Sequence, residues 1–186
     1  KMDWYQGDTL MTFLEKVEID ETIKNEKFTM PVQWVNRPNL DFRGFAGQVS
    51  SGSISVGDNI KVLPAGIETK VDSIVTFDGN IESAIKGQSV TITFEDEVDA
   101  SRGDVLVSDQ SDVKIAHIFE TKILWMSEEP MVPGKQYWLK IRAKMVSATL
   151  KEPKYKIDVN TLEKQQTSEL ALNEIGLSDL VVDQDI

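Results

Sequence analysis

The sequence predicts an all-β protein in which one short helix precedes two consecutive small β-barrels. Short runs of residues alternate apolar and polar side chains, which is the pattern of a half-buried strand. Turns rich in glycine, aspartate and asparagine separate these runs, as is typical of small barrels and sandwiches. A polar break at residues 108–112 divides the strand-rich sequence in two. We therefore expect two domains rather than one.

The composition excludes several classes of function. The 186 residues include 31 acidic and 20 basic side chains, for a net charge of −11, and no basic patch for the phosphates of nucleic acid is evident in the sequence. The absence of cysteine excludes disulfides, thiolate nucleophiles and zinc-thiolate sites. No apolar run approaches the roughly 18 residues of a membrane helix, and no signal sequence opens the chain. We expect a cytoplasmic protein.

Residues 1–20 are predicted to form a short helix and a linker. Asp8 is a plausible N-cap, and Leu10, Phe13, Leu14 and Val17 fall on one helical face. A helix this short is marginal alone. We therefore expect it to pack on chain that lies before residue 1.

Residues 21–110 are predicted to form the first barrel. Phe28, Met30, Val32 and Trp34 alternate with polar residues as in a half-buried strand, and Pro31 indicates that this strand lies at an edge or at an entry point of the sheet. Further strands are expected at residues 59–64, 68–77, 89–94 and 104–107.

The glycine-rich tract at residues 42–58 raises the possibility of a phosphate loop. Its glycines are widely spaced in the sequence, and no Lys-Ser or Lys-Thr follows them. A phosphate loop needs its glycines in one tight turn before a helix. We interpret the tract as two strands joined by a turn at Ser51-Gly52.

Residues 111–186 are predicted to form the second barrel. A long strand is expected at 113–126, a proline-flanked turn at 128–134, and two or three more strands within 135–159. The chain ends at residues 181–186 in residues typical of a strand. Because a barrel cannot close without its last strands, we expect this barrel to be incomplete at its C-terminus.

The residues that suggest a catalytic or metal site are better explained as structural. His117 lies alone in the apolar pattern of a strand and is expected in a core or interface, since a metal site needs three or four ligands. The acidic run at 95–99 lacks the regular spacing of a calcium loop, so a solvated loop is expected there, and Arg-Gly-Asp at 102–104 is expected to be a turn. The lysines at 151, 154 and 156 are expected at a solubilising edge. We predict no catalytic, cofactor-binding or metal-binding residue.

Large aromatic residues are the candidates for an interface. Of the four tryptophans, most are expected in cores, but large aromatics near domain joints also anchor partners. Trp4 and Tyr5 have the strongest claim because they precede the unpartnered helix. The predicted domain or partner interface comprises Trp4, Tyr5, Trp34 and Trp125.

Two stretches carry a family resemblance. Residues 43–74, with a serine before a glycine and a Val-Gly-Asp turn, and residues 84–107, with a Gly-Gln step and an Arg-Gly-Asp-Val turn, resemble the second domain of translation-type GTPases. The resemblance implies two Greek-key barrels similar to domains II and III of elongation factor Tu.

Other motifs narrow the resemblance. Residues 4–18, Asn-Arg-Pro at 36–38, Asn-Thr-Leu-Glu at 160–163 and Leu-Asn-Glu-Ile-Gly at 172–176 resemble the GTPase subunit of bacterial sulfate adenylyltransferase, or ATP sulfurylase. That family couples GTP hydrolysis to synthesis of adenosine 5′-phosphosulfate from ATP and sulfate in sulfate assimilation and cysteine biosynthesis. The resemblance implies three partners or cofactors elsewhere: a separate catalytic subunit (subunit 2), the protein's own GTPase domain, and GTP with Mg²⁺ in that domain.

The sequence contains no G-x-x-x-x-G-K-[ST] loop and no Asn-Lys-x-Asp guanine reader. We therefore expect a fragment without the GTPase domain, with residues 1–20 as that domain's last helix and linker. Such a fragment has no cofactor and is inactive alone, because phosphoryl transfer needs those parts; it would act as a scaffold. One alternative is the barrel region of a translation elongation factor that binds aminoacylated tRNA. The net charge of −11 disfavours this alternative, because RNA phosphates are also negative. An independent small-molecule-binding barrel is the other.

Overall fold

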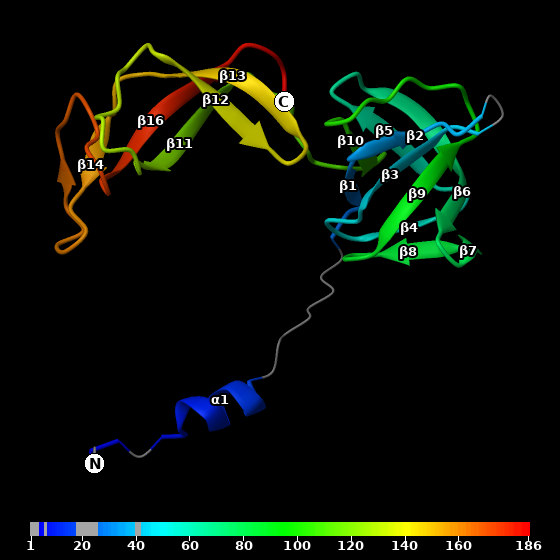
Figure 1. Ribbon diagram of the computed structural model, residues 1–186, viewed down its shortest axis with the longest axis horizontal. Helices are drawn as coiled ribbons and strands as arrows, with labels where there is room; N and C mark the ends of the chain where they lie inside the picture. Colours follow the sequence, from blue (N-terminus) through cyan, green and yellow to red (C-terminus); the bar gives the residue numbers. More distant parts are fainter. Residues whose placement is uncertain (1–3, 6, 18–25, 40–41) are drawn as a thin grey trace.

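The structure is a computed structural model that describes residues 4–5, 7–17, 26–39 and 42–186. Within these residues one short helix, α1 (Leu10–Lys16), precedes sixteen strands, and the strands pair in antiparallel fashion. Figure 1 shows the helix and the strands. The predicted all-β class with a short initial helix is confirmed. No helix in this part of the chain is long and apolar enough to cross a membrane.

The first sheet unit contains ten strands. Eight form one sheet: β1 (Thr29–Pro31), β2 (Trp34–Asn36), β3 (Gly44–Gln48), β5 (Asn59–Leu63), β6 (Ile67–Thr76), β7 (Gly79–Ile81), β9 (Ser89–Phe94) and β10 (Val105–Ser108). Their order is β1-β10-β5-β6-β9-β3-β2, with β7 paired to β6. The remaining two, β4 (Ser53–Ser55) and β8 (Ser83–Ile85), pair with each other.

Alternating apolar residues build the core of the first sheet unit. Ile60 and Val62 of β5 and Ile92 of β9 are fully buried, because successive side chains of a strand point to opposite faces. Phe45 stacks on Phe94 with ring centroids 4.4 Å apart. β1 lies at the end of the sheet order, so the edge position expected from Pro31 is confirmed.

Two expectations for the first sheet unit are wrong. β3 and β4 do not form a hairpin about Ser51-Gly52: β3 pairs with β2 and β9, and β4 pairs with β8. Gly52 nevertheless needs to be glycine, because its φ is +65° and a Cβ would lie 2.4 Å from the carbonyl oxygen of Glu26. The alternation expected to bury Trp34 ends at Val32, and Trp34 belongs to a separate edge strand.

The second sheet unit contains the six strands β11 (Ile118–Leu124), β12 (Gln136–Ile141), β13 (Lys144–Leu150), β14 (Tyr155–Ile157), β15 (Lys164–Gln165) and β16 (Ile175–Val182). β16 is the central strand and pairs with β11, β13 and β14. Small clusters form its core, one around Met131, Leu150 and Leu170 and one around Val146, Ala148 and Val182.

The long strand expected at residues 113–126 is shorter than predicted. β11 begins at Ile118, and residues 112–117 form no strand. Val113 and Ile115 share the apolar period of β11 but are exposed to 47% and 39%, because they lie in the segment that connects the two sheet units (Figure 1). Periodicity alone does not reveal where a paired strand begins.

Candidate interface residues

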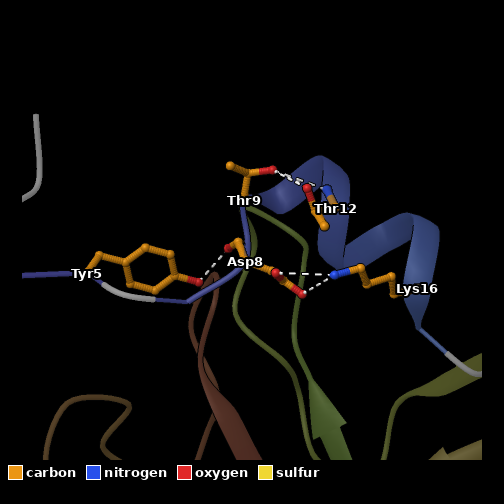
Figure 2. A network of polar contacts seen from close by, with 5 residues as sticks. All are labelled: Tyr5, Asp8, Thr9, Thr12 and Lys16. Carbon is orange, nitrogen blue, oxygen red and sulfur yellow. Dashed lines mark hydrogen bonds and ion pairs between the residues drawn. The ribbon is translucent and has the colours of Figure 1, made fainter.

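The first of the predicted interface residues lie just before α1. Trp4 and Tyr5 are 78% and 50% exposed, and their rings meet edge to face with centroids 6.1 Å apart. The Tyr5 hydroxyl donates a hydrogen bond of 2.7 Å to the carbonyl oxygen of Asp8 (Figure 2). A Cβ at Gly7 would lie 2.7 Å from that hydroxyl oxygen. The Tyr5 ring can fold back over the chain because residue 7 is glycine.

The cap of α1 differs from the expectation. Thr9, not Asp8, is the N-cap, and its hydroxyl oxygen accepts a hydrogen bond of 3.2 Å from the backbone N–H of Thr12. The prediction of Asp8 is wrong because its carboxylate reaches along the helix to the Lys16 ammonium at 3.3 Å (Figure 2). These local contacts support a helix of only two turns.

The apolar face of α1 is uncovered in the part of the chain that the structure describes. Leu10, Phe13, Leu14 and Val17 are 44–75% exposed, and α1 contains no buried residue. Together with Trp4 and Tyr5 they place six exposed apolar side chains within residues 4–17, and exposed apolar surface of this kind marks interaction sites.

Trp34 is exposed on the edge strand β2. It lies opposite Ala46 of β3 and is 63% exposed. β2 pairs only with β3 among the described strands. The indole therefore stands on the surface of the first sheet unit, where a large rigid ring is available to a partner.

Trp125 contributes to the interior of the second sheet unit. Its ring packs against the cluster of Met131, Leu150 and Leu170 and meets the Tyr137 ring edge to face at 5.5 Å. Its Nε1–H donates a hydrogen bond of 2.7 Å to the carbonyl oxygen of Glu129. The structure therefore separates Trp125 from the three exposed residues Trp4, Tyr5 and Trp34.

His117 was expected in a core or in an interface, and it does not lie in a core. Its side chain is 62% exposed, and its Nδ1 lies 3.5 Å from a carboxylate oxygen of Asp185. Among the described residues, no group of three or more His, Cys, Asp or Glu side chains is placed to hold a metal ion.

The acidic run lies in an exposed loop and the Arg-Gly-Asp tripeptide in a turn, as expected. Glu95, Asp96, Glu97 and Asp99 are exposed in an irregular segment after β9. Arg102 and Gly103 form a turn before β10, and the φ of Gly103 is +98°. That φ is rarely adopted by residues with a Cβ.

The lysines at 154 and 156 make specific ion pairs within the second sheet unit. Hydrogen bonds to Asp179 and then to Glu120 raise the pKa of Lys154. Lys156 contacts Glu174, and this contact, followed by the backbone N–H of Ala171, lowers the pKa of the Glu174 carboxyl. The expectation of a solubilising edge is therefore wrong here, since β14 lies between β16 and β15 and its lysine charge is matched by neighbouring carboxylates.

Three features of the structure are not predictable from the sequence pattern. Phe77, expected in a strand, lies in the turn after β6 and is fully exposed; Trp138 of β12 is 75% exposed. A small cavity lies between the two sheet units, with Lys114, Arg142 and Lys144 among its lining residues. These cations are separated in sequence, so no local run of charge indicates that they meet.

The sequence is similar to one described domain family and to one named enzyme subunit. The family described as GTP-eEF1A C-terminal domain-like matches residues 118–186. The chain is 52% identical to sulfate adenylyltransferase subunit 1 of Aliivibrio fischeri (strain MJ11) over 96% of its own length and 37% of that protein's. The same subunit of Saccharophagus degradans is 46% identical over 100% of the chain and 39% of the relative.

Solved structures of translation factors share the fold. Sup35 complexed with GDP superposes with a TM-score of 0.79 at 21% identity, covering 98% of this chain and 45% of that one. Elongation factor SelB from Methanococcus maripaludis, in its apo form, gives 0.70 at 22% identity over 95% of this chain and 38% of that one. Identities this low support the fold alone. The chain is thus similar, over nearly its whole length, to sulfate adenylyltransferase subunit 1, and it spans 37–39% of the length of these relatives.

Proposed function

We propose that this chain is the scaffold region of a sulfate adenylyltransferase subunit 1. In that subunit a GTPase domain, which binds GTP and Mg²⁺, couples GTP hydrolysis to the synthesis of adenosine 5′-phosphosulfate from ATP and sulfate in the cytoplasm. The observation that carries the proposal is the 42–52% identity to such subunits over 94–100% of the chain. The chain itself contributes binding surfaces and no catalytic group, cofactor site or metal site.

The proposed division of the chain follows from its sheets. Residues 1–20 provide the last helix of the GTPase domain and a linker, 21–110 the domain II-like barrel, and 111–186 the domain III-like barrel. In support, every pairing of β1–β10 stays within the first sheet unit and every pairing of β11–β16 within the second. The uncovered apolar face of α1 then packs on the rest of the GTPase domain.

The exposed aromatics carry the proposed communication between domains. Trp4, Tyr5 and Trp34 contact the GTPase domain or the catalytic subunit, subunit 2. The exposed part of the Trp125 ring belongs to the same interface. Contacts that differ between the GTP and GDP states couple the nucleotide to the catalytic subunit, because only a difference in binding between two states can shift their equilibrium.

The experiment measures how much GTP is hydrolysed for each adenosine 5′-phosphosulfate formed by the full natural chain with subunit 2. Trp4→Ala and Trp34→Ala are expected to raise this ratio several-fold, because truncation of a large interface aromatic weakens the contact. Trp138→Ala is the matched control, since Trp138 is similarly exposed but outside the proposed interface. An unchanged ratio in Trp4→Ala and Trp34→Ala, or an equal rise in Trp138→Ala, contradicts the proposal.

A further inference from the structure

A cavity lies at the junction of the two sheet units. Both units and the segment that connects them contribute residues to its walls. Its apolar lining includes Leu63, Pro64 and Val105 from the first unit, Val113 and Ile115 from the connecting segment, and Ile141 at the end of β12. This lining is mainly apolar, and burial of a further apolar group in it is favourable.

The size of the cavity restricts what it can hold. Its volume is about 80 Å³, whereas sites for drug-sized ligands measure roughly 300–1,000 Å³. An apolar cavity of about 150 Å³ accommodates a benzene molecule. The junction cavity therefore suits one branched aliphatic side chain, and the rest of any ligand must lie outside it.

Three cations surround this apolar space. Lys114 lies in the connecting segment, Arg142 lies in the β12–β13 turn, and Lys144 is the first residue of β13. None of the three makes an ion pair of 4.0 Å or less with a carboxylate in the part of the chain that the structure describes. Like charges that line one cavity without a paired side-chain carboxylate favour a ligand that brings carboxylates.

Lys144 is held in place by the first sheet unit. A Cβ at Gly103 would lie 3.0 Å from the Cβ of Lys144 and 3.4 Å from its Cδ. The aliphatic stem of Lys144 therefore packs along the turn at Gly103, and Lys144 is among the residues that line the cavity. A cation whose stem is already packed loses less conformational freedom when a ligand binds.

We infer that the junction cavity docks an acidic peptide segment of a protein partner, with one aliphatic side chain in the cavity and its neighbouring carboxylates on Lys114, Arg142 and Lys144. The cavity volume has room for a single aliphatic side chain, and the three cations attract carboxylates on either side of it. The inference rests on the proposed function, which supplies subunit 2 as the partner.

The test measures the affinity of subunit 2 for the full natural chain by calorimetric titration. The double variant K114E/R142E reverses two cations without touching the Lys144–Gly103 contact. The control K70E/K122E makes the same change of charge at exposed lysines that line no part of this cavity. A third variant, V113F, fills the cavity from an exposed position outside any strand.

We expect K114E/R142E and V113F each to raise the dissociation constant about tenfold or more, since each removes one of the two elements of recognition, while K70E/K122E stays near wild type. Equal affinity of K114E/R142E and wild type overturns the inference and leaves the proposed function standing. Failure of the wild type to bind overturns the proposed docking of subunit 2 and the inference with it. Filter binding of bulk transfer RNA that is lost in K114E/R142E, without binding of subunit 2, assigns the cations to nucleic acid instead.

Discussion

Gly103 of the first sheet unit and Lys144 of the second lie in contact, so that a Cβ added to Gly103 would be 3.0 Å from the Cβ of Lys144. The Gly103 backbone has a φ of +98°. Two separate constraints therefore keep this position glycine: the backbone conformation and the close approach of the lysine stem.

Gly103→Ala is expected to lower the free energy of unfolding of the first sheet unit by about 2 kcal/mol, because both constraints are violated. Gly87→Ala is the control, since Gly87 has a similar φ of +89° but open space around it. The control is expected to cost about 1 kcal/mol. Urea unfolding measures both values, and equal costs would show that the contact with Lys144 contributes nothing.

Thr9→Ala is expected to destabilise α1 by about 1 kcal/mol through loss of the N-cap. The backbone N–H of Thr12 then loses its hydrogen-bond acceptor. Hydrogen exchange at the amides of Phe13 and Val17 reports this change, because both donate within the helix. Thr9→Ser keeps a hydroxyl and should exchange nearly as slowly as wild type. Equal exchange in wild type and Thr9→Ala would contradict the assignment of Thr9 as the cap.

The pKa of Glu174 is lowered in the folded chain, first by Lys156 and then by the backbone N–H of Ala171. A carboxyl whose folded pKa lies below its unfolded pKa contributes stability above the unfolded value, which is lost as the pH falls through the folded value. We expect the free energy of unfolding of the second sheet unit to fall below about pH 4.5. Unfolding in urea between pH 7 and pH 3 measures this.

Glu174→Gln removes the titrating group and is expected to flatten that decline. Glu152→Gln is a suitable control, since Glu152 is exposed and makes no ion pair with the described residues. A decline in Glu174→Gln as steep as in wild type would mean that other carboxyls determine the acid sensitivity.

Trp125→Ala and Trp138→Ala are expected to differ strongly in stability. Trp125 packs on the cluster around Met131 and donates a hydrogen bond to Glu129, so its truncation should cost about 2–4 kcal/mol. Trp138 is 75% exposed, and its truncation should stay within about 0.5 kcal/mol. Urea unfolding of the two variants measures this difference. Similar losses in both would contradict the assigned burial.

The sequence predicts most strands of the first sheet unit because one of their faces is buried. Ile60 and Val62 alternate with polar residues, and this period is visible without any knowledge of pairing. Strand partners are not predictable in the same way: Ser51-Gly52 has the residues of a hairpin turn, yet the strands beside it pair elsewhere. Pairing depends on contacts between distant segments, which a local pattern does not contain.

Exposure of single aromatic residues is equally difficult to predict. Trp34, Trp125 and Trp138 all occur in apolar sequence, but only Trp125 is placed against a core. The junction cavity could not be found from sequence, because Lys114 and Lys144 meet only when the two sheet units have formed. The family resemblance, in contrast, rests on short motifs and needs no structure to be recognised.

The central claim is that the two sheet units themselves carry a docking surface for subunit 2. Calorimetric titration of residues 1–186 into subunit 2 of the same enzyme, without nucleotide, tests it most directly. Circular dichroism first establishes that the chain is folded with the expected strand content. We predict a saturable heat of binding with one chain per subunit 2. A folded chain that gives no heat of binding, and no retention by immobilised subunit 2, would contradict the claim and assign the contact to another part of subunit 1.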